Sequence, residues 1–210
     1  DMPFEVAGPM GCGIQTGAGG IMKALACEAG SSLLILGGGA VGLSAVMGAK
    51  IQGCGTVIVV EPHAVRRSLA LELGATHVID PVAEPDLAAA VRAIVAIGVD
   101  YAFDTTGRPD TLTATMACLG PKGVFGIVGI PPAGTPMPGD LGTVLTFGQT
   151  VRGIIEGDSD PDVFLPELMT HWREGRLPLE RLIKTFPLAQ INEAVVAQHH
   201  GDCVKVVLLT

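Results

Sequence analysis

Three glycines, Gly37, Gly39 and Gly42, form the most informative chemical pattern in this sequence. They give G-x-G-x-x-G within GGGAVG, directly after the apolar run LLIL at 33–36 and directly before a helical pattern at 40–52. In such a turn the first glycine permits the tight bend, the second lets backbone approach a pyrophosphate, and the third allows close helix packing. The strand and helix on either side make a dinucleotide site the favoured interpretation over a turn that is merely tight.

The residues around this turn predict which dinucleotide it would bind. The amides of Gly39, Ala40 and Val41, at the start of the helix, would face the phosphates with the helix dipole behind them. Glu61 ends the second predicted strand, nineteen residues after Gly42. A carboxylate there accepts hydrogen bonds from the adenosine ribose and repels a 2′-phosphate. The pattern therefore favours NAD over NADP.

Five further residues fall where a ligand of such a site would pass. Arg66 and Arg67 begin the next predicted helix; we expect Arg66 to contact the ribose and Arg67 to lie on a solvated helix face. Thr105, Thr106 and Val128 stand at the ends of later predicted strands. Ligands of doubly wound sheets bind at the carboxyl ends of the strands, so these three positions are candidates for contact with adenine and nicotinamide.

Cys12 lies between two glycines in GCGIQTG (11–17), with no neighbour in sequence that could help it hold a metal. The chain has five cysteines, which are Cys12, Cys27, Cys54, Cys118 and Cys203. Their odd number and the absence of a CxxC pair indicate reduced thiols in the cytoplasm rather than a disulfide scaffold. The histidines show no spacing typical of a metal site or a catalytic triad.

Short apolar runs alternate with helical patterns along the first three quarters of the chain. The predicted strands are 33–36, 56–61, 77–80, 99–104, 123–130 and 149–155, and the predicted helices are 40–52, 63–73, 84–97 and 109–119. This alternation predicts an α/β fold with a doubly wound, six-stranded parallel sheet. After residue 155 the rhythm breaks into two helical segments and a last strand at 204–209, and the proline-rich stretch 130–139 reads as an ordered loop.

Composition excludes several classes of partner. The formal net charge is −8, so there is no basic surface for nucleic acid or an anionic membrane, and a small soluble ligand is expected. The uncharged stretch 29–49 is long enough to suggest a membrane span, but the three consecutive glycines within it favour a buried strand and turn. The acidic start DMPFE is unlike a secretory leader.

Longer segments of the chain carry a family resemblance. The stretch GCGIQTGAGGIMKALACEAGSSLLILGGGAVGLSAVMGAK and the later VVEPHAVRRSLALELGATHVID resemble the coenzyme-binding domain of zinc-dependent medium-chain alcohol dehydrogenases. The resemblance continues through IVGIPP to the last strand and covers essentially all 210 residues. Within that family, RGIIEGDSDP and RLIKTFPLAQINEA are most similar to aryl-alcohol (benzyl-alcohol) dehydrogenases.

The resemblance implies a division of the chain and a metal role for one residue. Residues 14–155 would form the NAD-binding Rossmann domain, while 1–13 and 156–210 would complete or contact a GroES-like N-terminal catalytic domain that the sequence lacks. Cys12 would be the third protein ligand of a catalytic zinc whose other ligands lie in that domain, so zinc is expected only in the complete enzyme. Segments made to join another domain should expose apolar surface.

The resemblance also adds coenzyme contacts. Thr16 would pack near the nicotinamide. Ala40 and Val41 would meet the pyrophosphate and nicotinamide, and Val128 would bind the carboxamide through its backbone. Lys205 stands where the family often has an arginine that reaches the pyrophosphate, and lysine lacks the bidentate fork. Ile154 and Glu156 match positions beside the carboxamide.

The expected activity is NAD-dependent oxidation of primary alcohols, aromatic ones in particular, to aldehydes by hydride transfer. The fragment alone should be inactive, and the resemblance implies a cytoplasmic homo-oligomer joined near the sheet edge at 149–155. One alternative is the coenzyme domain of a zinc-independent, NADPH-dependent quinone or enoyl reductase, against which Cys12 and Glu61 both count. The other is a non-catalytic NAD-binding module.

Overall fold

The computed structural model describes residues 2–201 and 203–210 and is built around a six-stranded sheet. The strands are β1 (Ser32–Leu36), β2 (Thr56–Val60), β3 (His77–Ile79), β4 (Val99–Asp104), β5 (Leu119–Ile127) and β6 (Thr150–Gly153). They lie in the order β3-β2-β1-β4-β5-β6, and all neighbours are parallel. The predicted doubly wound α/β sheet is confirmed.

The strand order places a topological switch point between β1 and β4. From β1 the chain winds outward through β2 to β3, then crosses back to β4 and winds outward the other way to β6. In open sheets of this kind, ligands bind where the winding direction reverses, at the carboxyl ends of the strands. We therefore expect a ligand-binding site at the loops that follow β1 and β4.

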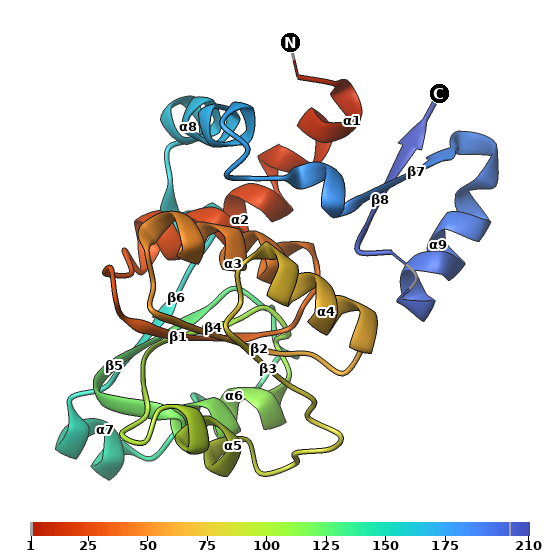
Figure 1. The fold of residues 1–210 in the computed structure, drawn as a ribbon. Helices are drawn as coiled ribbons and strands as arrows, with labels where there is room; N and C mark the ends of the chain where they lie inside the picture. The colour runs from red at the N-terminus through yellow and green to blue at the C-terminus, as the bar shows by residue number, and fades with distance from the viewer. Residues whose placement is uncertain (1, 202) are drawn as a thin grey trace.

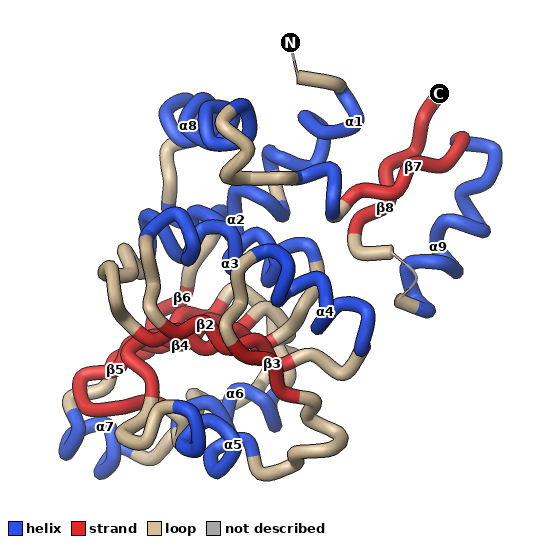
Figure 2. The backbone as a smooth tube through the Cα atoms, in the orientation of Figure 1, coloured by secondary structure: helices blue, strands red, loops and turns tan. Residues whose placement is uncertain are grey.

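Helices cover both faces of the sheet (Figure 1). One layer consists of α2 (Gly13–Gly19), α3 (Ala40–Gln52) and α4 (Ala64–Leu73), and the other of α5 (Leu87–Ile94), α6 (Pro109–Met116) and α7 (Leu141–Phe147). Figure 2 shows the strands as a single layer between them. Each face buries its own apolar cluster, with Met47 and Phe103 in one and Leu34 and Phe125 in the other.

Close packing between α2 and α3 depends on a glycine. A Cβ atom on Gly17 would lie 2.1 Å from Val41 O and 2.8 Å from Ser44 Cβ, so no larger residue fits there. The same approach brings the start of α2, where Cys12 and Thr16 lie, beside the start of α3. Two regions that are distant in sequence thus meet at the switch point.

The C-terminal unit comprises β7 (Ile183–Pro187), α9 (Ile191–His200) and β8 (Lys205–Leu209), and it follows α8 (Pro161–Arg173). β7 and β8 form a separate parallel two-stranded sheet at one side of the molecule (Figure 1). The two predicted helices and the last strand are present. The sequence prediction missed β7, whose side chains are mostly exposed and give no buried apolar run.

Three further details of the prediction were wrong. The segment α7 was not expected; the Asp140 side chain caps it by accepting from Thr143 N at 2.8 Å. β5 begins at Leu119 rather than 123, because Leu119 already pairs with Val99 of β4; the strand then continues through Lys122, which takes a positive φ of 61°. The helix expected over 84–97 is shorter, since Asp86 caps its start by accepting from Ala89 N at 3.0 Å.

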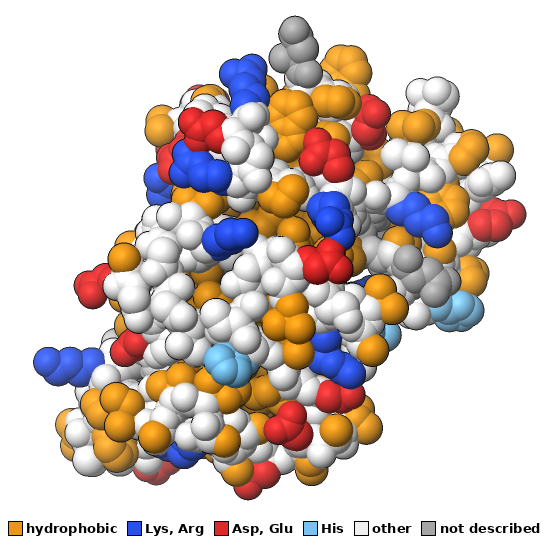
Figure 3. Space-filling model, viewed as in Figure 1, with side chains coloured by type: hydrophobic (Ala, Val, Ile, Leu, Met, Phe, Trp, Pro, Cys, Tyr) orange, Lys and Arg blue, Asp and Glu red, His pale blue; other side chains and the backbone are white. Residues whose placement is uncertain are grey.

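Apolar side chains are exposed in the terminal segments, as expected, and also elsewhere. In 1–13 and 156–210 they include Phe4, Val163, Leu188, Ile191, Val195 and Val196. Outside those segments they include Ile130, Met137, Leu141, Leu145 and Ile155. Figure 3 shows hydrophobic side chains on the surface over the C-terminal unit and near α7. In the described part of the chain, no helix has the length and apolar character needed to cross a membrane.

Substitution of the buried Phe103 tests the packing of the core beneath the switch point. It is fully buried, and a Cβ on Gly20 would lie only 2.4 Å from it. We expect Phe103→Ala to lower the free energy of unfolding by about 3–5 kcal/mol through cavity formation, measured by urea denaturation. The matched control Phe4→Ala, at a ring that is 93% exposed, should change it by less than about 0.5 kcal/mol. Equal effects would contradict this packing.

Candidate dinucleotide-binding site

The turn after β1 and the turn after β4 are packed against each other through Gly37. This glycine has φ of +99°, and a Cβ on it would lie 2.5 Å from Thr105 Oγ1 and 3.3 Å from Thr106 Cγ2. The Thr105 hydroxyl donates to Leu36 O at 2.8 Å. Gly37, Thr105 and Thr106 thus lie together at the switch point; the Thr105 side chain joins the two turns, and Thr106 bonds to Asp104 within its own turn.

Asp104 anchors the turn after β4, a role that the sequence analysis missed. Its carboxylate is fully buried and accepts from Thr106 Oγ1 at 2.7 Å and from Gly107 N at 2.8 Å. Burial raises the pKa of this carboxyl, and the hydrogen bonds oppose that shift. An acid directly before Thr105 at the end of a buried strand was the available signal.

Val128 is tied to the same anchor through its backbone. Its N–H donates to Asp104 O at 3.0 Å, next to the bond from Gly129 N at 3.1 Å. A backbone contact from Val128 to a ligand would therefore have to use its carbonyl oxygen as an acceptor. That polarity suits an amide NH₂ group, which is a donor.

The N-terminus of α3 has donors without a protein cap. Its N-cap is Gly39, in an extended conformation, and no side chain caps the first turn. Because the first amides of a helix lack intrahelical partners and carry the positive end of the dipole, this end attracts anions. A Cβ on Gly39 would meet no atom within 4 Å, so the space in front of these amides is open.

Gly42 allows the start of α3 to pack closely against the end of β1. A Cβ there would lie 1.8 Å from Gly37 O, so the helix start can approach the strand end only because this position has no side chain. Ala40 and Val41 occupy the first turn of α3 between the two glycines. The G-x-G-x-x-G roles predicted from spacing therefore fit the observed geometry: a tight bend, an open approach and close packing.

Glu61 lies beside this turn with its carboxylate already hydrogen-bonded. The residue is 3% exposed; Oε2 accepts from Gly38 N at 2.7 Å, and Oε1 accepts from His63 N at 2.9 Å. The His63 ring adds a contact of 2.6 Å from Nδ1 to Oε1. These bonds fix the acid beside the glycine turn. No role for His63 was predicted from the sequence, although it is only two residues from Glu61.

The two arginines of α4 do not behave as a solvated pair. Arg67 was expected on a solvated face, and this was wrong: its side chain is 18% exposed, pairs with Asp80 at 2.9 Å and donates to Glu61 O at 2.8 Å. Arg66 donates to Gln198 O and Cys203 O, both at 3.4 Å. It therefore points to the C-terminal unit, and its contact with a ribose stays a prediction without support from this geometry.

Cys12 and Thr16 lie at the start of α2. Cys12 is exposed, and Thr16 Oγ1 donates to Glu156 Oε2 at 3.3 Å. Glu156 takes a positive φ of 48°, and its carbonyl accepts from Gln15 Nε2 at 3.2 Å. The segment after β6 is thereby held against α2, which brings Glu156 near Thr16.

Lys205 is separate from the glycine turn. It begins β8 in the two-stranded sheet, where its N–H donates to Leu182 O at 2.9 Å. Among the described residues no hydrogen bond or ion pair joins its side chain to residues 37–42. Its contact with a pyrophosphate stays a prediction.

Within residues 2–201 and 203–210, no three His, Cys, Asp or Glu side chains gather in a way that could hold a metal ion. Cys12 alone does not make a zinc site. A residue of this kind can contribute to one only together with ligands from outside the described chain.

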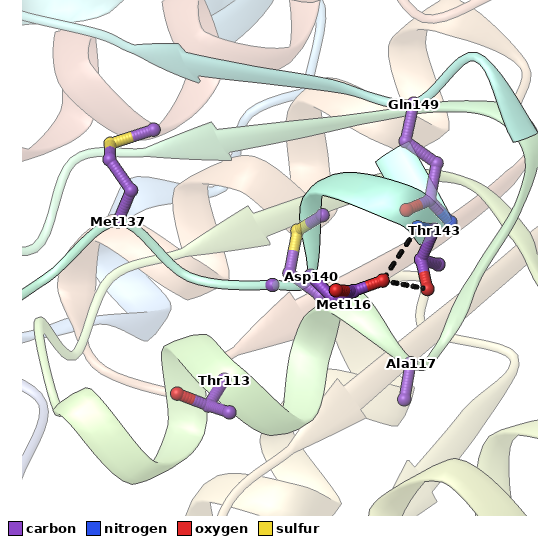
Figure 4. A pocket seen from close by; sticks show the side chains of 8 residues that line it. Thr113, Met116, Ala117, Met137, Asp140, Thr143 and Gln149 are labelled. Carbon is purple, nitrogen blue, oxygen red and sulfur yellow. Dashed lines mark hydrogen bonds between the residues drawn. The ribbon is translucent and has the colours of Figure 1, made fainter. Parts of the chain in front are cut away.

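One pocket of the structure lies away from these residues. It has a volume of about 450 Å³ and is lined by residues of α6, the loop before α7 and the start of β6, including Met116, Met137 and Gln149 (Figure 4). Figure 4 also shows Asp140 bonded to Thr143 at its wall. None of the predicted site residues lines it.

Comparison with known proteins gives consistent matches. The family model described as zinc-binding dehydrogenase matches residues 40–170. Geraniol dehydrogenase of Castellaniella defragrans is 47% identical over 209 residues, which is all of this chain and 56% of that protein. The chain therefore spans little more than half the length of this relative.

Two solved structures are similar over almost the whole chain. An alcohol dehydrogenase zinc-binding domain protein from Burkholderia ambifaria has a TM-score of 0.95 and 47% identity, with 99% of this chain and 56% of that one covered. Benzyl alcohol dehydrogenase from Acinetobacter calcoaceticus also has a TM-score of 0.95, with 39% identity and coverages of 99% and 57%.

Two glycine substitutions separate binding from folding. Gly39→Ala adds a methyl group to open space, so the free energy of unfolding should fall by less than about 1 kcal/mol, while dinucleotide affinity falls at least about tenfold. Gly42→Ala forces a clash with Gly37 O and should cost about 1–3 kcal/mol or more. Thermal unfolding and calorimetric titration measure both. Unchanged affinity in Gly39→Ala would contradict the placement of the phosphates.

Proposed function

Because the chain belongs to the family of zinc-binding dehydrogenases, we propose that it is the NAD-binding part of a zinc-dependent alcohol dehydrogenase. The observation that carries the proposal is the uncapped N-terminus of α3, with open space at Gly39 and the buried Glu61 carboxylate beside it. The N-terminus of α3 can bind an anion, and the Glu61 carboxylate beside it can accept hydrogen bonds from hydroxyl groups. These two groups suit the pyrophosphate and the adenosine ribose of one dinucleotide.

The phosphate end of the site uses backbone donors. The amides of Gly39, Ala40 and Val41 would hold the pyrophosphate, and Gly39 leaves space for it. Because these donors belong to a helix packed tightly through Gly17 and Gly42, little reorganisation is needed on binding.

The ribose end selects the coenzyme. The Glu61 oxygens accept bonds from Gly38 N and His63 and retain further lone pairs for ribose hydroxyls. A 2′-phosphate would bring like charges together in a buried environment, which is unfavourable. Arg66 and Arg67, the cations that could have compensated, are bound to Gln198, Cys203 and Asp80.

The nicotinamide end would lie between Thr16 and the carbonyl of Val128. The Val128 carbonyl would accept from the carboxamide, and Thr16, held by Glu156, would pack near the ring. When bound, NAD accepts a hydride from the carbon that carries the hydroxyl group. This chain's part is to fix the face of the ring presented to the substrate.

We place Cys12 as one ligand of a zinc ion in the whole protein. It is exposed at the start of α2, near the proposed nicotinamide pocket through Thr16. Since residues 2–201 and 203–210 supply no further ligands near it, the others would come from outside these described residues.

The substrate class follows from the named relatives. One relative, 47% identical, is a geraniol dehydrogenase, and another, 39% identical, is a benzyl alcohol dehydrogenase. Geraniol and benzyl alcohol are both primary alcohols with a double bond or an aromatic ring beside the carbinol carbon. We propose the same class here, which includes the aromatic alcohols expected from the sequence. The product would be the corresponding aldehyde.

Calorimetric titration with NAD and NADP tests the coenzyme. NAD should bind more tightly, and Glu61→Ala should weaken it by about 10- to 100-fold through loss of charge-assisted hydrogen bonds. His63→Ala keeps the carboxylate and should keep the preference for NAD. A preference for NADP in the unaltered chain would instead support the zinc-independent reductase.

Metal analysis tests Cys12. In the whole zinc-loaded protein, Cys12→Ala should lower bound zinc at least about tenfold and abolish alcohol oxidation, because the substitution removes a thiolate ligand. The side chain is exposed, so thermal stability of the metal-free protein should not change. Full zinc content and activity in Cys12→Ala would refute the zinc role, whatever the outcome of the coenzyme titration.

A further inference from the structure

Cys27 and Cys54 lie on two adjacent loops at the amino edge of the sheet, opposite the coenzyme site. Cys27 precedes β1 and Cys54 precedes β2, which is the strand next to β1. Backbone hydrogen bonds clamp the loops together: Gly30 N donates to Gly53 O at 2.8 Å and Gly55 N donates to Ser31 O at 2.9 Å. The two cysteines are thus held close by structure that neither of them provides.

Side-chain hydrogen bonds also join the two loops around the cysteines. The Cys27 and Cys54 side chains share a hydrogen bond. Gln52 Nε2 donates to Cys27 O at 3.3 Å, and Ser31 Oγ lies 3.8 Å from Cys54 Sγ. Cys27 is only 2% exposed, whereas Cys54 is only half-buried.

The shared hydrogen bond divides the two thiols into an ionised member and a protonated one. Donation from Cys27 lowers the pKa of Cys54 to about 7, with a smaller contribution from Ser31 and with burial acting in the opposite direction. The same bond and burial raise the pKa of Cys27, and the nearby Asp100 carboxylate acts in the same direction. Near neutral pH the half-buried Cys54 sulfur is therefore partly thiolate, while Cys27 keeps its proton.

The other cysteines of the chain lack this arrangement. Cys118 is fully buried, and burial raises its pKa to about 12. Cys203 is 7% exposed, and Cys12 is exposed but lies at the start of α2, away from both loops. Reactivity follows thiolate character and access together, which only Cys54 combines with a neighbouring thiol.

We propose that Cys54 is a site of thiol oxidation by hydroperoxides and that Cys27 resolves the product as a Cys27–Cys54 disulfide. The Cys54 thiolate attacks the peroxide O–O bond, forming an S–O bond and releasing hydroxide or alkoxide, so that sulfur is oxidised and the peroxide reduced. The Cys27 sulfur then gives up its proton and attacks the sulfur of the sulfenic acid; the S–S bond forms, the S–O bond breaks, and the hydroxyl group leaves with that proton as water.

This inference is independent of the proposed function. The disulfide would connect the loops at the amino ends of β1 and β2, whereas the coenzyme site lies at the carboxyl ends. Because the loops are already fixed by backbone bonds, the crosslink needs only local side-chain movement. Coenzyme affinity should therefore differ by less than about twofold between the reduced and oxidised forms.

Peptide mapping tests the linkage directly. The purified protein is treated with a small excess of hydrogen peroxide at pH 7, remaining thiols are alkylated, and the protein is digested with trypsin without reduction. Cleavage after Lys50 separates Cys27 from Cys54, and the remaining cysteines fall in three further peptides. We expect peptide 24–50 joined to peptide 51–66, with loss of the link after treatment with a thiol reductant.

Two variants at Cys27 separate its two roles. Cys27→Ser keeps a hydrogen-bond donor but cannot form the disulfide, so a dimedone reagent should trap sulfenic acid at Cys54. Cys27→Ala removes the donor, so alkylation of Cys54 at pH 7 should slow roughly tenfold as its pKa returns toward that of a free thiol. Cys118→Ser serves as the matched control and should leave both reactions unchanged.

The opposite results would overturn the proposal. Oxidation of the unaltered protein that leaves Cys54 reduced, or that halts at sulfenic acid while Cys27 remains alkylatable, would exclude the disulfide. Equal alkylation rates at Cys54 in the unaltered and Cys27→Ala proteins would exclude activation by Cys27. The peptide mapping uses only the unaltered protein, so its result holds even where a variant folds poorly.

Discussion

The close approach of α3 to its neighbours is the constraint on which the site depends. Gly17 lets α2 touch the backbone of α3 at Val41, and Gly42 lets the first turn of α3 touch the end of β1 at Gly37. These contacts are between backbone atoms, so the helix start has almost no freedom to shift. Its amide donors are consequently held in place, with no side-chain cap on the first turn and open space at the Cβ position of Gly39.

Buried acids on either side of this turn make the site rigid before any ligand binds. Asp104 holds the turn after β4 through Thr106 and Gly107, and Glu61 holds Gly38 and His63. Each acid satisfies backbone donors that would otherwise be buried without partners, which is costly. The same bonds that stabilise the fold therefore set the shape of the binding surface.

The sequence predicted the sheet and the glycine turn because their signals are local. Period and spacing alone place LLIL, Gly37, Gly39 and Gly42, and the α3 bounds agree with the prediction. The side chains of Arg66 and Arg67 bind partners at residues 198, 203 and 80. Most of these partners are distant in sequence, so a local pattern does not predict the contacts. The missed strand β7 is likewise defined only by its pairing with β8.

The helix α4 connects the surroundings of Glu61 with the C-terminal unit. His63, its N-cap, contacts the Glu61 carboxylate, and the same ring lies against Gly201, where a Cβ would be 2.9 Å from His63 Cδ2. Arg66 adds bonds to the carbonyls of Gln198 and Cys203. The C-terminal unit is thus attached to the rest of the chain beside the acid proposed to bind the ribose. A change in how that unit packs would act on the position of His63 first, and through its hydrogen bond on Glu61.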